Sequence, residues 1–182
     1  FSDMLANICI IAAGVRYFLN VVAKSEWKVE PPPDSGEEGQ KKADLLREMM
    51  DDMETPWHRV IRRAAMFKFY GFSVQEWTAK IREKDGLVGM ADIEPRPQRT
   101  IERWDLDRNS RVLGVVQTNP QNGQEIYIPR EKLIYLVDDS LDDSPEGLGL
   151  FRHLVETAKR LQRYEMLERF GYENDLRGIP IA

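Results

Sequence analysis

The sequence predicts an α+β fold, in which an antiparallel β-meander or small barrel is flanked by amphipathic helices and followed by a long C-terminal helix. From residue 72 to residue 137, short runs of alternating apolar and polar residues are separated by turn sequences rich in Asp, Asn and Gly. This spacing is typical of antiparallel strands. Before and after this segment, apolar residues recur every three or four positions, as on one face of a helix. We therefore expect three parts: helices with one short strand and a Pro/acidic linker at 1–71, a β-rich domain at 72–137, and an acidic loop with the long helix at 138–182.

The first predicted element is a helix over residues 4–22, with Asp3 as its N-cap. Uninterrupted apolar sequence covers only residues 8–15, whereas a membrane-spanning helix needs about 20 predominantly apolar residues. The opening Phe1-Ser2-Asp3 lacks the basic residues of a signal peptide. We expect a buried or interface helix and no membrane contact. Because the chain starts without methionine, we also expect a fragment of a longer protein.

Residues 26–30 alternate between polar and apolar and predict a short strand. Pro31-Pro32-Pro33 ends this strand, since proline cannot donate to a ladder. A flexible acidic linker at residues 34–39 leads to an amphipathic helix that includes residues 43–53. A second helix begins at Thr55-Pro56 and ends at Gly71, because glycine adopts a left-handed cap without a Cβ clash.

The helix after Pro56 carries Arg59, Arg62, Arg63 and Lys68 between its apolar residues. Such cations are consistent with a patch that binds a phosphate backbone or with a solvated helix face. The formal net charge of the chain is -5, which provides no global field to attract nucleic acid or anionic lipid. We therefore favour the solvated face.

Strands are predicted around residues 72–81, 87–93, 101–104, 112–117, 126–128 and 133–137. The first should place Gln75, Trp77, Ala79 and Ile81 on one face, and Lys84-Asp85-Gly86 is a strong hairpin turn. Residues 133–137 are apolar without interruption, which predicts a strand buried on both faces. We expect the rest of the fold to be built around this strand.

The final helix is predicted to begin with Ser144 as its N-cap and Pro145 in its first position. Gly147 and Gly149 would then lie inside its first turn, and Gly171 would end it. Its apolar stripe consists of Phe151, Leu154, Val155, Ala158, Leu161, Tyr164, Leu167 and Phe170. A helix of this length that leaves a compact β-unit is expected to meet a partner.

The sequence predicts no catalytic, cofactor-binding or metal-binding residue. Asp138, Asp139, Asp142 and Asp143 form the one carboxylate cluster, and carboxylates of this kind bind Mg²⁺ or Ca²⁺. The EF-hand pattern is not met, however, and acidic residues before a helix also stabilise its positive end, which is the interpretation we favour. His58 and His153 lie in helical patterns without a metal-binding spacing, and the single cysteine, Cys9, allows no disulfide within the chain.

Several short motifs occur in a recognisable order. They are Glu26-Trp27-Lys28-Val29, Tyr70-Gly71-Phe72-Ser73-Val74-Gln75-Glu76-Trp77, Ile93-Glu94-Pro95-Arg96-Pro97, Trp104-Asp105-Leu106-Asp107, Ile128-Pro129-Arg130-Glu131-Lys132-Leu133-Ile134, Pro145-Glu146-Gly147-Leu148-Gly149-Leu150 and Glu168-Arg169-Phe170-Gly171. Their order and spacing, over nearly the whole chain, resemble those of the portal proteins of tailed bacteriophages, in particular the Mu-like portal family.

The resemblance implies a structural protein and not an enzyme, without cofactors. Portal proteins form a dodecameric ring at one capsid vertex, through which double-stranded DNA passes. The implied partners are sibling subunits, the terminase large subunit, a capsid or scaffold protein and head-tail connector proteins, in the virion and, during assembly, in the host cytoplasm. The chain would be the wing-like part, with its long helix leading towards a stem outside this fragment. Candidate residues at the subunit interface, for which core packing is the alternative, are Trp104, Tyr127, Phe151, Leu154, Leu161 and Tyr164.

Two other functions remain as alternatives. One is a Mg²⁺-dependent phosphoesterase that uses the loop from Asp138 to Asp143. The other is a monomeric adaptor that binds a peptide along an open edge of its β-domain.

Overall fold

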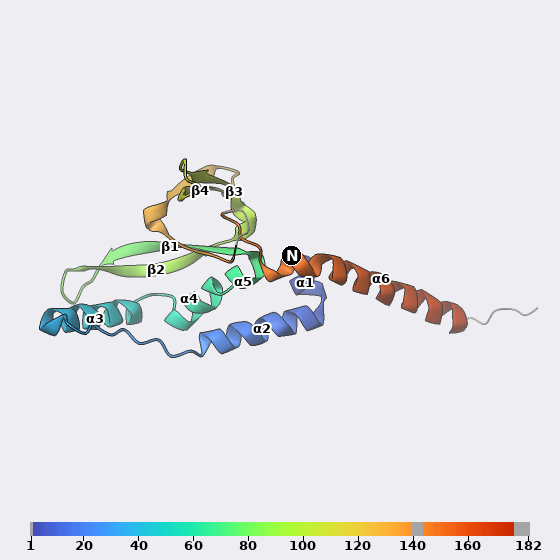
Figure 1. The fold of residues 1–182 in the computed structure, drawn as a ribbon, viewed down its shortest axis with the longest axis horizontal. Coiled ribbons are helices and arrows are strands. Elements are labelled where there is room, and N and C mark those ends of the chain that lie inside the picture. The colour runs from blue at the N-terminus through green and yellow to red at the C-terminus, as the bar shows by residue number, and fades with distance from the viewer. Residues whose placement is uncertain (1, 140–143, 177–182) are drawn as a thin grey trace, which may run out of the picture.

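The computed structural model describes residues 2–139 and 144–176, and its fold is α+β, as the sequence predicts (Figure 1). The helices are α1 (Ser2–Asn7), α2 (Cys9–Ala23), α3 (Gly36–Asp51), α4 (Trp57–Ala64), α5 (Phe67–Tyr70) and α6 (Leu150–Leu176). The strands are β1 (Phe72–Ile81), β2 (Val88–Arg96), β3 (Ile101–Leu106), β4 (Val112–Thr118), β5 (Glu125–Pro129) and β6 (Leu133–Val137). Short 3₁₀ turns at Gln98–Thr100 and Arg130–Lys132 precede β3 and β6.

The strands form two three-stranded antiparallel sheets, with orders β2-β1-β6 and β3-β4-β5. The sheets do not close into a barrel, so the meander prediction is confirmed and the small-barrel alternative is wrong. A shared core joins the two sheets, made of Phe72, Val74, Val115, Ile128 and Leu133. Helices α3, α4 and α5 lie on the other side of the first sheet (Figure 1).

The central strand is β1, not the run at 133–137. Residues 133–137 do form a strand, β6, but it pairs with β1 alone, and only Leu133 is buried while Val137 is exposed. The first four residues of β1 are buried instead, because they lie between the second sheet and the helices. Beyond them the β1–β2 hairpin leaves the core, so Trp77 and Ile81 are exposed although they share the predicted face with buried Gln75. The predicted turn at Lys84-Asp85-Gly86 joins β1 and β2.

Three predictions for the N-terminal part are corrected. The helix over residues 4–22 is divided at Ile8, whose φ of -111° and ψ of 100° interrupt the helical backbone. Residues 26–30 form no strand; no other strand lies beside them, and Arg47 of α3 donates to the carbonyl of Val29. The acidic linker is shorter than predicted, because α3 already begins at Gly36.

The helix predicted from Thr55-Pro56 to Gly71 is present as α4 and α5, with a tight turn at Ala65-Met66 between them. Gly71 ends α5 in the left-handed conformation, with φ of 101°. This cap is confirmed.

The start of the last helix differs from the prediction. Helix α6 begins at Leu150, and Ser144 to Gly149 form a turn. The reason is the backbone of Gly147 and Gly149, whose φ values of 58° and 59° are left-handed and do not fit a helical first turn. Gly171 does not end the helix either, since α6 runs on to Leu176 and reaches about 40 Å at 1.5 Å per residue.

Three glycines meet where α5, β6 and α6 converge, and we call this the glycine junction: Gly71, Gly147 and Gly149. A Cβ on Gly149 would lie 2.3 Å from the Gly71 nitrogen, and one on Gly147 would lie 2.5 Å from the Gly71 oxygen. The Asp138 amide donates to the Gly71 carbonyl at 2.7 Å, and the Leu148 amide donates to the Asp139 carbonyl at 3.1 Å. These backbone contacts fix the position of α6 at its first residue.

Side chains reinforce the junction. Lys68 of α5 pairs with Asp138 at 2.6 Å, and the Tyr135 hydroxyl donates to the Pro145 carbonyl. Burial raises the pKa of Tyr135 to about 12, so this donor keeps its proton over the physiological range.

The helices share a second core, to which α1, α2, α5 and the base of α6 contribute. Phe151 is fully buried at its centre, with ring centroids 5.4 Å from Phe69 and 5.3 Å from Tyr70. The glycine junction directs Phe151 into this core, because α6 begins only one residue earlier.

We predict that Gly149→Ala lowers the free energy of unfolding by about 2 kcal/mol or more, from the cost of a non-glycine left-handed residue and the overlap with backbone atoms. The control is Gly171→Ala, where no atom lies within 4 Å of the added Cβ. In the helix interior this change should stabilise by roughly 0.5–1 kcal/mol. Urea unfolding monitored by circular dichroism measures both; equal effects of the two changes would contradict the junction.

Candidate subunit interface

Helix α2 is apolar on two sides. One side, which includes Val15 and Leu19, is buried in the helical core. The other carries Ile10, Gly14, Tyr17 and Val21 at spacings of four, three and four residues, which place them on one face. Ile10 is 71% exposed and Tyr17 is 74% exposed. An exposed apolar face of this kind is typical of a contact site, so this face is the first candidate contact surface.

An apolar groove lies between α2 and the base of α6, with a volume of ≈ 260 Å³. Its lining consists of Ile10, Ile11, Gly14, Val15, Phe69, Leu150, Phe151 and Leu154. No heavy atom lies within 4 Å of the place where a Gly14 side chain would begin. The groove is therefore open at this point to a side chain from outside.

Helix α6 leaves the body of the molecule after its first two turns (Figure 1). Phe151 and Ala158 are buried, but every residue from 159 to 173 is exposed. On this free part, Leu161 and Tyr164 continue the side of the helix that bears Leu154, since Leu161 follows Leu154 by seven residues and Tyr164 follows Leu161 by three. Glu165 and Glu168 lie on the same side, each four residues after one of them.

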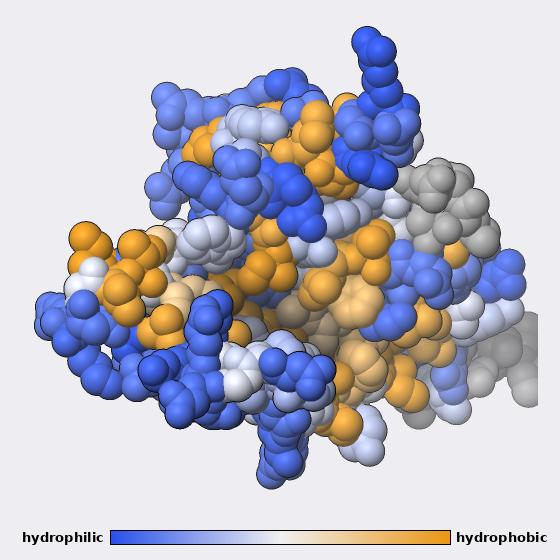
Figure 2. All heavy atoms as spheres, turned by 60° about the vertical axis from the view of Figure 1, so that its left-hand side comes forward, coloured by the Kyte–Doolittle hydropathy of each residue, from blue (hydrophilic) through white to orange (hydrophobic). Residues whose placement is uncertain are grey.

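Other apolar surface is spread over the molecule. Figure 2 shows one face on which hydrophobic residues gather in the middle, while hydrophilic residues occupy much of its margin. The tip of the β1–β2 hairpin exposes Ile81, Leu87 and Val88. This tip is separate in sequence from the α2–α6 groove.

The structure distributes the six predicted interface residues over different surroundings. Leu154 lines the groove, while Leu161 and Tyr164 lie exposed on the free part of α6. Phe151 is core, and Trp104 packs between Phe72 at 5.1 Å and Tyr135 at 5.2 Å. The half-exposed Tyr127 donates to Asp105 Oδ2 at 3.0 Å on the second sheet.

The interface role of all six stays a prediction. The sequence reasoning missed the exposed face of α2. The signal for it was the second apolar stripe at Ile10, Tyr17 and Val21, in a helix without any acidic residue.

The acidic loop does not form a metal site in the part that the structure describes. Asp138 is paired with Lys68, and this hydrogen bond raises the pKa of Lys68. Asp142 and Asp143 lie outside the described residues. Among residues 2–139 and 144–176, no three His, Cys, Asp or Glu side chains are grouped so as to hold a metal ion. His58 and His153 are both exposed.

Arg59, Arg62 and Arg63 of α4 line a cavity of ≈ 360 Å³ with Leu19 and Met66. Arg62 also donates to Asn20 of α2. One of these cations thus holds α2 and α4 together. No helix in the described ranges is both long and apolar enough to cross a membrane.

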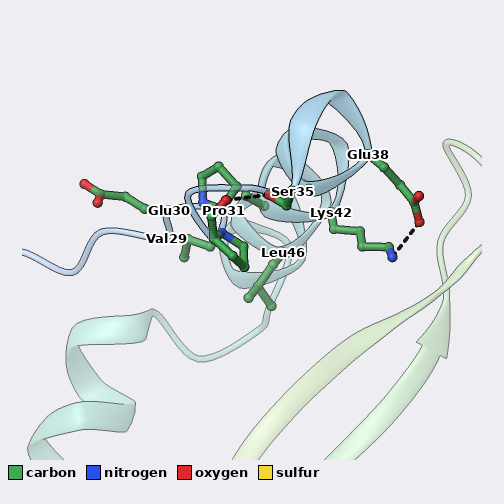
Figure 3. A pocket seen from close by; sticks show the side chains of 10 residues that line it. Val29, Glu30, Pro31, Ser35, Glu38, Lys42 and Leu46 are labelled. Atoms are coloured by element: carbon green, nitrogen blue, oxygen red, sulfur yellow. Dashed lines mark hydrogen bonds and ion pairs between the residues drawn. The ribbon is translucent and has the colours of Figure 1, made fainter.

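A second groove, larger in volume than the α2–α6 groove at ≈ 410 Å³, lies where residues 29–32 cross α3 (Figure 3). Val29 and Leu46 contribute to its apolar lining. At its rim Lys42 and Glu38 pair with each other at 2.7 Å, and the Ser35 hydroxyl donates to the Pro32 carbonyl at 2.7 Å. Both contacts are local, the first within α3 and the second across the turn that leads into it.

A buried cation attaches α3 to the hairpin. The Arg82 side chain is only 2% exposed and lies 2.6 Å from Glu48, 3.4 Å from Asp52 and 3.5 Å from Asp85. It fills the space that the absent side chain of Gly89 leaves, because a Cβ there would lie 2.8 Å from Arg82 Cγ. The hydrogen bond from Arg82, followed by that from Lys84, lowers the pKa of Glu48. This cluster has a structural role.

Comparison with models of known protein families identifies a related family. The family model described as the portal protein of Mu bacteriophage matches residues 1–171. A search of the curated proteins gives no match.

The Glu48 cluster predicts an acid-sensitive component of stability. Since the pKa of Glu48 is lowered in the folded state, its contribution is complete above the ordinary glutamate pKa and is lost as the pH falls below it. We expect Glu48→Gln to reduce the loss of unfolding free energy between about pH 5 and about pH 3. The measurement is urea unfolding at several pH values, with Glu102→Gln as the control, since Glu102 is an exposed residue of β3. An unchanged pH dependence in Glu48→Gln would contradict this role.

Proposed function

The chain belongs to the portal protein family of Mu bacteriophage, and we propose that it is a structural subunit of a portal ring at one vertex of a phage capsid. The ring, expected to be dodecameric, is a conduit for DNA during packaging and ejection. It also docks the terminase large subunit, a capsid or scaffold protein and the head-tail connector proteins. Residues 72–137 form the wing-like domain of the subunit, and α6 leads towards the stem.

The observation that carries this proposal is the family match over residues 1–171 of the 182-residue chain. The surface supports it independently. A self-assembling subunit needs an apolar contact surface, because the centre of a protein interface is depleted of charge. The exposed face of α2 and the free part of α6 supply such surfaces on one chain.

The electrostatics suit a conduit. A formal net charge of -5 does not favour tight binding of DNA through phosphate neutralisation, which would slow its passage. The phosphoesterase alternative gains no support from Asp138, whose carboxylate is occupied by Lys68. We therefore propose a non-enzymatic role in the virion, with assembly in the host cytoplasm.

Negative-stain electron microscopy of the full-length protein at micromolar concentration tests the proposal. We expect rings with a central hole, and light scattering should give the mass of a multimer. Uniform small particles with the mass of one chain would contradict the ring and would favour the monomeric adaptor.

A further inference from the structure

We infer that neighbouring subunits dock head to tail, with the free part of α6 from one copy seated in the α2–α6 groove of the next. The occupant is thus a second copy of this chain. The contact joins Leu161 and Tyr164 of one copy to the surface at Ile10, Gly14 and Leu154 of the other. This inference rests on the proposed ring and specifies which surfaces form it.

The two surfaces have matching shape and polarity. The groove is lined by apolar side chains and opens at Gly14, where no atom lies within 4 Å of the absent side chain. Leu161 and Tyr164 project from the part of α6 in which every residue from 159 to 173 is exposed, and Tyr164 is 68% exposed. Small residues allow close approach of a helix, so Gly14 suits the point where the neighbouring α6 crosses α2.

Charge complementarity points to the same occupant. Glu165 and Glu168 lie on the same side of α6 as Leu161 and Tyr164, together with Arg160, which precedes Tyr164 by four residues, whereas Arg163 lies on the opposite side. Helix α2 contains no acidic residue, and Arg16 within it and Lys24 at its end are exposed beside the apolar face. Within the described ranges, Glu165, Glu168, Arg16 and Lys24 form no ion pair with another side chain of their own chain. Docking would bring the two carboxylates towards the two cations.

The contact is heterologous, because the groove and the free part of α6 are different surfaces of one chain. Heterologous contacts generate rings when the rotation closes. Leu161 of one copy would meet the level of Leu150 to Leu154 of the next, an offset of about 10–16 Å along the helix at 1.5 Å per residue. Subunits related by rotation about a ring axis are not displaced along that axis. If α6 were parallel to the ring axis, neighbouring helices would show no such offset, so the docking requires α6 to be inclined to the ring axis.

Cysteine pairing in the full-length protein tests the contact, in a Cys9→Ser background that removes the native thiol. A Gly14→Cys variant is mixed with a Leu161→Cys variant before assembly, so that any disulfide joins different chains. A disulfide requires Cα atoms closer than about 7 Å, and on this ground we expect a ~10-fold higher yield of cross-linked dimer than with Arg163→Cys in place of Leu161→Cys. Arg163 is also exposed but lies on the side of α6 opposite to Leu161.

Electron microscopy of the same samples separates the inference from the proposed function. Rings with the Leu161-specific cross-link support both. Rings with no cross-link, or with equal yields at positions 161 and 163, overturn the docking mode and leave the ring. The cross-link in open filaments supports the docking mode and overturns closure, while monomers without a cross-link overturn both.

Discussion

The close packing of three backbones at Gly71, Gly147 and Gly149 is the constraint on which the rest of the structure depends. Each glycine has a left-handed φ, and an added Cβ on any of them would lie within 2.5 Å of a backbone atom of the others or their neighbours. The junction brings the end of α5, the end of β6 and the start of α6 together. Because α6 begins there, Phe151 enters the helical core and the distal part of the helix extends into solvent. The same contacts therefore hold Phe151 in the helical core and set the direction in which the exposed distal part of α6 extends.

The exposed apolar surface of α2 and α6 arises because the rest of the described chain covers only part of each helix. Helix α2 has enough apolar residues for burial on two faces, but its own chain covers only the one that contains Val15 and Leu19. The distal half of α6 has apolar residues and no neighbour in the described chain. Exposed apolar faces of this kind mark contact sites. Membership in the Mu bacteriophage portal family provides a reason for them, since a ring subunit must be covered by its neighbours.

Local patterns in the sequence predicted the elements better than their arrangement. The α+β class, the meander, the Gly71 cap and the long last helix depend on periodicity and turn residues, which are local. The central place of β1 over β6 could not be predicted, because it depends on pairing between distant segments. The start of α6 was misplaced because Ser144 and Pro145 are favourable helix-start residues, whereas the left-handed glycines after them serve a contact with Gly71, about 75 residues away. Of the candidate interface, the α6 residues follow from the predicted apolar stripe of that helix. An interface at α2 was among the expectations, but its exposed face was not identified, because a single apolar stripe already explained the pattern.

A cryo-electron microscopy reconstruction of the assembled full-length protein, at a resolution that shows side chains, would show how neighbouring subunits meet. We expect a closed ring in which α6 of each subunit is inclined and lies across α2 of the next, with Leu161 over Gly14 and Tyr17 covered. A ring in which the α2 face with Ile10 and Tyr17 remains in solvent, or in which α6 contacts no neighbouring α2, would contradict this expectation.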